Sequence, residues 1–475
     1  MTRTLSTEVL IIGSGAGGAV TAARLAEAGR SVLVAEEGSW YDPDAHEPSS
    51  LDEFTARYRH QGACAALGSP GVAFAEGRCV GGSTEINMGL YHRLPERFVD
   101  QWRTTYSIAE FDSATLRRYA DEVEAIVKVS RLPGAPPESS AVLSRGADAL
   151  GWRSVEFDRV YSYDESGHGT KQSMSRTMIP RAVAAGAVVQ ADCTVRSLIR
   201  KGRRVTGARA TLRYPDGSTE PVVVQAEDVF VCGGAIQSPA LLQRSGFRHN
   251  IGPGLKFHPT VKVAARFDHP YDHEEVPVQR VTEFDPYLTI GGSASRRGHV
   301  ALALVDSAPG DLDRLLEHWQ NVVVYYAAIR SSGSGRVLAI PGLQAPLVTY
   351  SLNDSDLSRL ARGLVHLGEM LLAAGAQELF PSIAGGPIVR SRADLAQWWG
   401  ALNRTQSNLM TVHLTSTIRM GDNSALTGAD SFGRVWDSDN LFVNDASLLP
   451  DAPGVNPQAA VMTIAARNAD AYLAR

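Results

Sequence analysis

Two glycine-rich segments are the parts of this sequence best suited to holding a large cofactor. The first, residues 13–18, reads Gly-Ser-Gly-Ala-Gly-Gly and follows the apolar segment 8–12. This pattern predicts a strand, a tight turn and a helix whose first N–H groups bind the pyrophosphate of a dinucleotide. Gly13 permits the turn, Gly15 lets the backbone approach the phosphates, and Gly18 lets the helix pack on the strand.

An acidic residue lies where the ribose of a dinucleotide would need one. Glu36 follows a second apolar segment, 31–35, at the distance of about 20 residues that is typical of dinucleotide-binding folds. Its carboxylate is placed to accept hydrogen bonds from the adenosine ribose hydroxyls, which argues against a 2′-phosphate. These features predict a dinucleotide site and leave open whether the dinucleotide is a flavin or a nicotinamide.

The second glycine-dense loop, residues 77–89, has a spacing unlike that of a nucleotide fingerprint. It contains Gly81 and Gly82 followed by Ser83, and it ends near Asn87. Because glycines let the backbone pass close to another group, we expect this loop to lie against a large planar ligand.

The elements that must position these loops predict a fold with two parts. Residues 227–232 form an apolar strand followed by Gly-Gly-Ala and a helix, and residues 441–443 and 458–475 read as a strand and a closing helix. Residues 259–405 differ, since apolar and polar residues alternate between turns before an amphipathic helix at 354–374. We expect an α/β protein with a Rossmann-like dinucleotide-binding domain and a second, α+β substrate domain built on an antiparallel sheet.

Changes in this pattern give the predicted domain limits. The dinucleotide-binding domain is expected to comprise residues 1–100, 176–258 and 406–475, and is therefore discontinuous. The substrate-binding domain is expected to comprise residues 101–175 and 259–405.

The composition excludes several classes of protein. The 475 residues are 44% hydrophobic and 20% charged, which is typical of a globular chain rather than a disordered one. The net charge of −5 is spread along the chain, so nucleic acid is not an expected partner. We find no export signal and no apolar run long enough to span a membrane, and we expect a cytoplasmic protein. The four cysteines are widely spaced and are expected to be reduced core thiols, and no spacing predicts a metal site.

Taken together, the motifs resemble those of the glucose-methanol-choline (GMC) oxidoreductases from residue 8 to the C-terminus. The segments that carry the resemblance are 13–18, 77–89, 234–246, 252–259, 413–421, 443–447 and 456–458. One departure is Ser416, which stands where the family usually has glycine.

The resemblance implies a flavoenzyme with FAD in an extended pose. The residues implied to bind it are Gly13, Gly15, Ala16, Gly18 and Glu36 on the ADP half, Val195 near the adenine, Gly81, Gly82, Ser83 and Asn87 against the flavin, and Asp445, Ala446 and Pro457 near the ribityl chain and ring. Some relatives attach FAD through a histidine just before the loop asparagine. Here that position is Ile86, so we expect non-covalent FAD.

The resemblance also implies the catalytic pair. In this family a histidine on the substrate side of the flavin acts as base beside a second histidine or an asparagine, and His413 and Asn456 match those positions. An imidazole accepts the hydroxyl proton at neutral pH as hydride leaves the alcohol carbon. Asn456 then donates an N–H to the developing alkoxide. We assign the other eleven histidines, His258 included, to surface or structural positions.

The substrate is expected to be a small-molecule alcohol, with oxygen or another electron acceptor reoxidising the flavin. A sugar, glycoside or polyol hydroxyl is the first expectation, and a sterol or another bulky alicyclic alcohol is the alternative. Aromatic residues of the middle segment are expected to stack on sugar rings, wall an apolar pocket or fill the sheet core; they are Trp319, Tyr325, Tyr326, Trp398 and Trp399. The acidic run 272–275 fits a solvated loop or a contact with a cationic aminosugar.

Three rival classes are disfavoured by particular residues. An NAD-dependent dehydrogenase has no place for the 77–89 loop. A family member that uses FAD without oxidising an alcohol, or a flavin-binding protein without catalysis, would not need both His413 and Asn456. Oxidase and dehydrogenase activities are not distinguished by the sequence.

Overall fold

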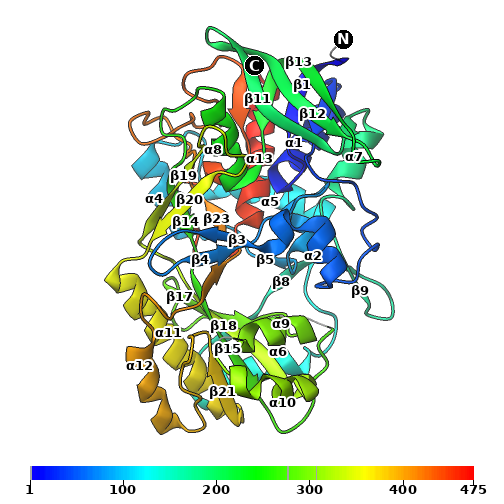
Figure 1. Ribbon diagram of the computed structural model, residues 1–475. Coiled ribbons are helices and arrows are strands. Elements are labelled where there is room, and N and C mark those ends of the chain that lie inside the picture. The colour runs from blue at the N-terminus through cyan, green and yellow to red at the C-terminus, as the bar shows by residue number, and fades with distance from the viewer. Residues whose placement is uncertain (1–2, 275–277, 306) are drawn as a thin grey trace.

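The structure is a computed structural model that describes residues 3–274, 278–305 and 307–475. Two lobes lie along its long axis, each organised around a β-sheet (Figure 1). The N- and C-terminal segments lie together in one lobe, and the middle of the chain forms most of the other.

The first lobe is built on a largely parallel sheet of seven strands in the described part of the chain. Their order is β10-β2-β1-β13-β12-β11, and β24 pairs with β13. The strands are β1 (Arg3–Ile12), β2 (Val32–Ala35), β10 (Val188–Gln190), β11 (Cys193–Lys201), β12 (Arg204–Arg213), β13 (Thr219–Val231) and β24 (Leu441–Val443). Because β1 is parallel to β2 and β13, and β24 is parallel to β13, the carboxyl ends of these strands meet at one edge.

Helices cover this sheet, and the last helix of the chain packs on the first. The helices of this part are α1 (Ala16–Glu27), α4 (Glu96–Tyr106), α5 (Ser113–Val127), α7 (Met178–Ala184), α8 (Gly234–Arg244) and α13 (Gln458–Leu473). Small buried residues on α1 and α13, such as Ala22 and Ala466, let these two helices approach closely. The predicted closing helix is thereby confirmed, and β24 near the C-terminus pairs in the same sheet as β1.

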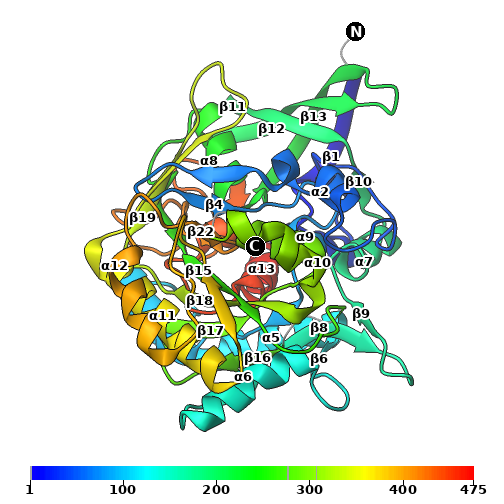
Figure 2. The same ribbon diagram turned by 60° about the horizontal axis from the view of Figure 1, so that its bottom comes forward.

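The second lobe is built on a mostly antiparallel sheet. Nine strands in the described residues follow the order β3-β4-β22-β15-β18-β17-β16-β7, with β21 paired to β15. They are β3 (Cys64–Ala66), β4 (Val72–Phe74), β7 (Ser154–Glu156), β15 (Thr260–Arg266), β16 (Gln279–Val281), β17 (Leu288–Gly292), β18 (Val322–Ile329), β21 (Glu378–Pro381) and β22 (Leu409–Thr411). Helices α6 (Glu138–Ala149) and α11 (Asp354–Ala373) bury their apolar faces on one side of this sheet, and α9 (Arg297–Leu304) packs on β15 and β18 (Figure 2).

Two smaller sheets join the lobes. One has the order β20-β19-β14-β23, with strands β14 (Pro253–Phe257), β19 (Ser334–Leu338), β20 (Leu347–Ser351) and β23 (Leu414–Thr415). The other contains β5 (Leu90–Tyr91), β6 (Val129–Ser130), β8 (Asp158–Tyr163) and β9 (Gly169–Lys171). The remaining short helices are α2 (Leu51–Arg57), α3 (Ser83–Ile86), α10 (Leu312–Glu317) and α12 (Trp398–Ala401).

The α/β class and the two predicted architectures are confirmed by this arrangement. The domain limits stay a prediction, although β3, β4 and β22, which fall within the segments assigned to the dinucleotide-binding domain, pair in the antiparallel sheet. Strand β20, which lies within the segment 259–405, pairs with β19 of a smaller sheet and bonds to Leu67, the residue after β3.

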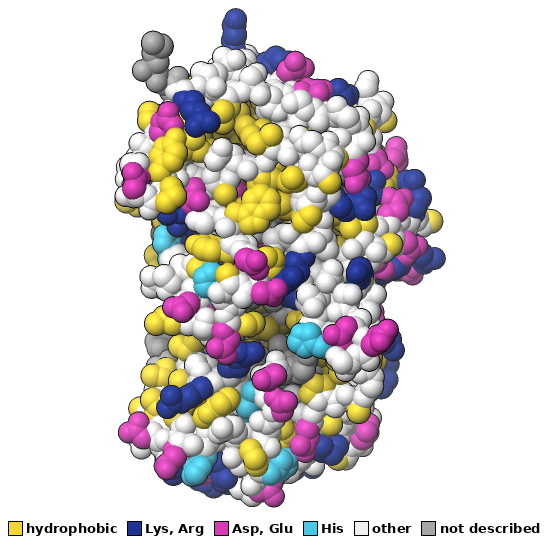
Figure 3. Space-filling model, turned by 90° about the vertical axis from the view of Figure 1, so that its right-hand side faces the viewer, with side chains coloured by type: hydrophobic (Ala, Val, Ile, Leu, Met, Phe, Trp, Pro, Cys, Tyr) yellow, Lys and Arg dark blue, Asp and Glu magenta, His cyan; other side chains and the backbone are white. Residues whose placement is uncertain are grey.

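The surface and the cysteines agree with the composition. On the face shown in Figure 3, acidic and basic side chains are interspersed and neither sign forms a continuous field. The four cysteines are buried free thiols, as predicted. Within the described ranges, no helix combines the length and the apolar character needed to cross a membrane.

Candidate functional site

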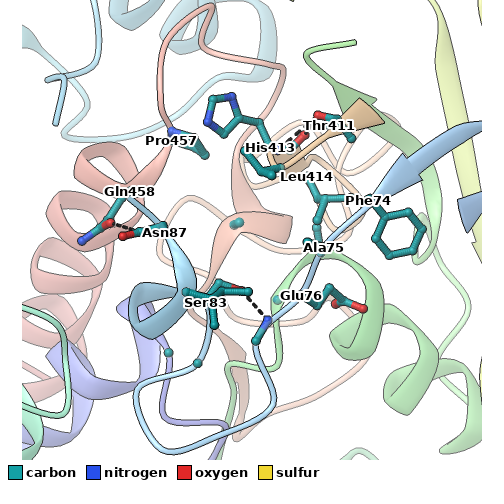
Figure 4. Close-up of a pocket in the computed structure, with 18 of the residues that line it drawn as sticks. Phe74, Ala75, Glu76, Ser83, Asn87, Thr411, His413, Leu414, Pro457 and Gln458 are labelled. Atoms are coloured by element: carbon teal, nitrogen blue, oxygen red, sulfur yellow. Dashed lines mark hydrogen bonds between the residues drawn. The ribbon is translucent and has the colours of Figure 1, made fainter. Parts of the chain in front are cut away.

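A cavity of about 990 Å³ is lined by residues of both lobes. The carboxyl ends of the parallel strands and the 77–89 loop form one part of its wall, and strands β15, β17 and β18 form another. Figure 4 shows residues of this wall, with His413 beside Pro457 and with Ser83 and Asn87 on the opposite loop.

The first glycine run is shaped by contacts with neighbouring backbone. A Cβ on Gly13 would lie 2.5 Å from the Cys232 carbonyl oxygen, and φ at Gly13 is +102°, in the left-handed region. A Cβ on Gly18 would lie 2.0 Å from the Gly13 carbonyl oxygen. A Cβ on Gly15 would instead meet nothing within 4 Å and would project into open space at the start of α1. This is the space that a phosphate at a helix N-terminus needs, so the residues fit the phosphate groups of FAD.

The carboxylate of Glu36 stabilises this turn through hydrogen bonds. One carboxylate oxygen accepts hydrogen bonds from the Ser14 N–H at 3.0 Å and the Ser14 hydroxyl at 2.7 Å, and the other accepts from the Gly38 N–H at 2.9 Å. Burial raises the pKa of Glu36. The side chain also lines the cavity, so a ribose hydroxyl would share an acceptor that already orders the loop.

The second glycine loop is tied to the first and to the C-terminal helix. The Gly81 N–H donates to the Ser14 hydroxyl at 3.0 Å, and the Asn87 amide donates to Gln458 at 2.6 Å (Figure 4). A Cβ on Gly82 would lie 2.9 Å from the Gly15 Cα, so the two glycine runs touch. The cavity wall at Gly15 and Gly82 is therefore backbone rather than bulky side chains, which lets a planar ring lie close to it.

Asp445 closes the cofactor part of the cavity beneath the C-terminal turn. Its carboxylate accepts hydrogen bonds from the Gly234 N–H at 2.7 Å and the Ser447 N–H at 2.8 Å, and from the hydroxyls of Ser238 and Ser447. Burial raises the pKa of Asp445. The carboxylate thus orders three chain segments where a ribityl chain would pass.

His413 stands between the cofactor part of the cavity and the antiparallel sheet. Its Nε2 lies 3.2 Å from the Asn456 side-chain amide, and its Nδ1 lies 2.9 Å from Nδ1 of His258. The strand pairing explains the second contact, because Phe257 on β14 pairs with Leu414 on β23 and the next residues outward are these two histidines. Burial lowers the pKa of His413 to about 4 and also lowers that of His258. Both rings are therefore neutral at pH 7.

A backbone donor decides which nitrogen of His258 carries the proton. The Gly454 N–H donates to His258 Nε2 at 3.0 Å, so neutral His258 carries its proton on Nδ1 and donates it to His413 Nδ1. This leaves His413 with its own proton on Nε2. The opposite tautomer, with a free electron pair on His413 Nε2, suits the amide N–H of Asn456 but breaks the bond from Gly454. The two networks compete for the same pair of rings.

The structure brings most of the predicted site residues to the cavity wall. Those that line it are Gly13, Gly15, Ala16, Glu36, Gly82, Ser83, Asn87, Val195, His413, Asp445, Ala446, Asn456 and Pro457. Gly18 and Gly81 lie behind the wall and serve the packing of the turns. Ser416 adopts φ of +76°, so the turn keeps the left-handed conformation without glycine.

Sequence reasoning missed His258 and His92 as residues of the site. His258 was assigned to a surface or structural position, and the structure buries its ring against His413 in the cavity wall. A signal was present, because His258 lies within the segment 252–259 that carried the resemblance. His92 also lines the cavity beside Asn456, and burial lowers its pKa to about 3.

Comparison with known proteins gives consistent matches over nearly the whole chain. The GMC oxidoreductase family models match residues 9–260 and 341–465. A GMC-type oxidoreductase of Sinorhizobium fredii is 38% identical over 481 residues, covering 99% of this chain and 95% of that protein. A long-chain-alcohol oxidase of Arabidopsis thaliana is 24% identical over 508 residues, covering 96% of this chain and 66% of that protein. The crystal structure of pyridoxine 4-oxidase from Mesorbium loti has a TM-score of 0.74 at 20% identity and covers 99% of each chain.

Two glycine variants should separate cofactor binding from folding. Gly15→Ala should leave the resistance of the apoprotein to urea unchanged and weaken FAD binding, because its Cβ projects only into the phosphate space. Gly18→Ala should lower the free energy of unfolding by about 1–3 kcal/mol, because its Cβ meets the Gly13 carbonyl. Urea unfolding and FAD titration measure the two quantities. Wild-type FAD affinity in Gly15→Ala would contradict this view of the turn.

Proposed function

Because the chain belongs to the GMC oxidoreductase family, and is therefore an FAD-dependent enzyme acting on CH–OH donors, we propose that it oxidises a sugar, glycoside or polyol hydroxyl to the carbonyl, with His413 accepting the hydroxyl proton. The observation that carries the proposal is the position of His413. Its imidazole faces the same cavity as the two glycine loops and has Asn456 beside its Nε2 atom.

Which ring nitrogens of His413 and His258 carry protons determines whether His413 can act as the base. To accept a proton at Nε2, the ring must hold its own proton on Nδ1 and donate it to His258. That tautomer gives up the Gly454 hydrogen bond, so substrate binding has to favour it over the resting network. Nδ1 of His258 then accepts a hydrogen bond from the Nδ1–H group of the imidazolium that forms on His413, which stabilises its charge.

Asn456 is placed to serve the substrate oxygen. Its amide lies at the Nε2 edge of His413, and its N–H stabilises negative charge that develops on the oxygen as the proton leaves. FAD, when bound, supplies the redox chemistry by accepting the hydride of the alcohol carbon. We propose that Gly82, Ser83 and Asn87 hold its ring without a covalent bond.

The polar part of the wall favours a polyhydroxylated substrate. Side chains with hydroxyl, amide, ammonium or imidazole groups line the cavity beyond His413; they are Thr260, Lys262, Thr289, Ser293, His299, Tyr326, Ser382 and Asn408. Such side chains pair with the several hydroxyls of a sugar or polyol. Of the five aromatic residues named from the sequence, Tyr326 lines the cavity, whereas Tyr325 and Trp398 lie in the sheet core.

A bulky apolar alcohol, such as a sterol, is the second candidate, and one observation favours it. Leu302, Leu343 and Val412 line the cavity and are 65%, 58% and 56% exposed. An apolar substrate would remove these side chains from water. The name of the Arabidopsis relative, a long-chain-alcohol oxidase, agrees with such a substrate.

Anaerobic mixing with a panel of alcohols tests the proposal. D-glucose, methyl glucoside and D-glucitol should bleach the visible absorbance of the bound flavin, and cholesterol should not. Bleaching by cholesterol alone would replace the sugar with the second candidate. If no alcohol on the panel reduces the flavin, the proposed oxidation is contradicted.

Removal of the base should abolish flavin reduction without loss of FAD. His413→Ala should slow anaerobic reduction by about 10²–10⁴-fold, the range typical of a general base. His168→Ala, in an exposed turn, is the control and should be unchanged. A wild-type rate in His413→Ala would exclude the ring as base.

The pH dependence of flavin reduction should follow the lowered pKa of His413. Burial disfavours the charged ring, so the neutral base is present above pH about 4 and is lost as the pH falls through that value. The rate should therefore be level between about pH 5 and 8, with its acid limb near 4. An acid limb near 6.5 would show that the ring titrates as an ordinary exposed histidine.

Acid treatment tests the mode of FAD attachment. Because Ile86 stands where some relatives carry the linking histidine, precipitation with trichloroacetic acid should leave a colourless pellet and yellow supernatant. A yellow pellet would mean that another residue forms a covalent bond to the flavin.

A further inference from the structure

The part of the cavity that is lined by residues 258–412 has an excess of positively charged side chains. Among the described residues between 258 and 412, the cavity wall includes one lysine and two arginines but no aspartate or glutamate. The acidic residues that line the cavity, Glu36, Glu37, Glu76 and Asp445, come from the segments that surround the cofactor loops. The acidic run at 272–275 does not balance the charge, because Asp272 and Glu274 are exposed and absent from the wall, and Glu275 lies outside the described residues.

The two arginines are already paired. Arg280 lies 3.4 Å from the carboxylate of Asp285, and Arg330 lies 2.6 Å from that of Asp451. Lys262 differs, because its ammonium makes no hydrogen bond or ion pair with any residue that the structure describes. Lys262 is partly buried and lines the cavity, so its ammonium is free to pair with a charged group of a ligand there.

The backbone of Lys262 is held by hydrogen bonds, although its ammonium is unpaired. It lies in the middle of β15, where its backbone N–H donates to the Ser382 hydroxyl at 2.8 Å and its carbonyl accepts from the Ser382 N–H at 2.8 Å. It pairs with Tyr326 across the strands. Burial lowers the pKa of Lys262 to about 8, so the ammonium is still protonated at neutral pH.

Two further polar side chains line the cavity on the elements next to Lys262. The Tyr326 ring leans over Gly291 of β17, where a Cβ would lie 2.7 Å from it, so its hydroxyl is directed away from β15. His299 on α9 has an Nδ1 atom that is buried and unpartnered among the described residues. Burial, with the charge of Lys262 as a smaller cause, lowers the pKa of His299 to about 4, so this ring is a neutral hydrogen-bond donor.

We propose that the substrate carries an anionic group, a carboxylate or a phosphate, which binds to Lys262 with the help of His299. This inference rests on the proposed function, since it concerns the end of the substrate that does not react at His413. The ammonium and a ring N–H of neutral His299 are both donors, and together they match the oxygens of a carboxylate or phosphate.

The strand also sets where the anionic group lies. Lys262 is four residues beyond His258 along the segment that leads into β15, at most about 14 Å for an extended chain. The side chains of Thr260 and Lys262 share one face of β15, since side chains alternate along a strand. The anionic group is therefore expected on the face of β15 that borders the cavity, no more than about 14 Å along the chain from His258.

Pairs of alcohols that differ only in charge test the inference on the holoenzyme. D-glucuronate and glucose 6-phosphate are compared with D-glucose, and 6-hydroxyhexanoate is compared with 1,6-hexanediol, by anaerobic flavin reduction. At least one anionic member should half-saturate at a concentration about 10- to 100-fold below that of its neutral partner, as expected for a charge-assisted hydrogen bond. Whether carboxylate or phosphate shows the larger effect identifies the source of the charge.

Variants of Lys262 assign the effect to this side chain. Lys262→Met should remove the preference, so that the anionic and the neutral member of each pair half-saturate at the same concentration, and Lys262→Arg should keep part of the preference. Lys201→Met, which removes an exposed lysine of β11, is the matched control and should behave as the wild type. Equal half-saturation within every pair, or a preference that survives in Lys262→Met, would overturn the inference.

A binding measurement keeps this test independent of turnover. Hexanoate should bind to the oxidised holoenzyme more tightly than hexanamide in calorimetric titration, and Lys262→Met should abolish the difference. If this holds while no alcohol reduces the flavin, the anion site stands and the proposed oxidation fails. If the alcohols reduce the flavin but hexanoate and hexanamide bind equally, the oxidation stands and the anion site is excluded.

Discussion

The close approach of three strand ends to the N-terminus of α1 is the constraint on which this structure depends. A Cβ on Gly13 would meet the carbonyl of Cys232 at the end of β13, and one on Gly17 would lie 1.9 Å from the carbonyl of Asn444 at the end of β24. No side chain fits at these positions, so the first turn of α1 is wedged among β1, β13 and β24. The parallel pairing of these strands makes the approach unavoidable.

The geometry of the reacting side chain follows from that contact by a short chain of hydrogen bonds. In the turn after β24, the carbonyl oxygens of Ala446 and Ser447 accept hydrogen bonds from the N–H groups of Ser416 at 3.2 Å and Ile418 at 2.9 Å. These two bonds fix the segment that begins at His413. β23 within that segment pairs with β14, and this pairing sets His258 beside His413. The position of the His413 imidazole is therefore fixed relative to the strands and helix that would hold the cofactor phosphates, although the ring lies at the edge of the other sheet.

The sequence predicts the cofactor side of the molecule well, because glycine patterns report backbone geometry directly. Gly13 and Gly15 are needed for reasons that act within a few residues, and the same is true of the strand and helix around them. His258 and Lys262 were not found, because their roles arise from pairing between distant strands. A lysine in an alternating segment reads as an exposed strand residue until the structure shows that its face of β15 borders a cavity. The tautomer of His413 likewise depends on Gly454, a backbone donor that no side-chain pattern reveals.

The substrate deuterium isotope effect on anaerobic flavin reduction tests the central claim most directly. The account predicts that an alcohol deuterated at the hydroxyl-bearing carbon reduces the bound flavin more slowly than the unlabelled alcohol, since the bond from that carbon to hydrogen breaks as His413 takes the hydroxyl proton. Reduction at the same rate with both alcohols, across the pH range in which His413 is neutral, would show that this bond does not break in the measured step and would contradict the account.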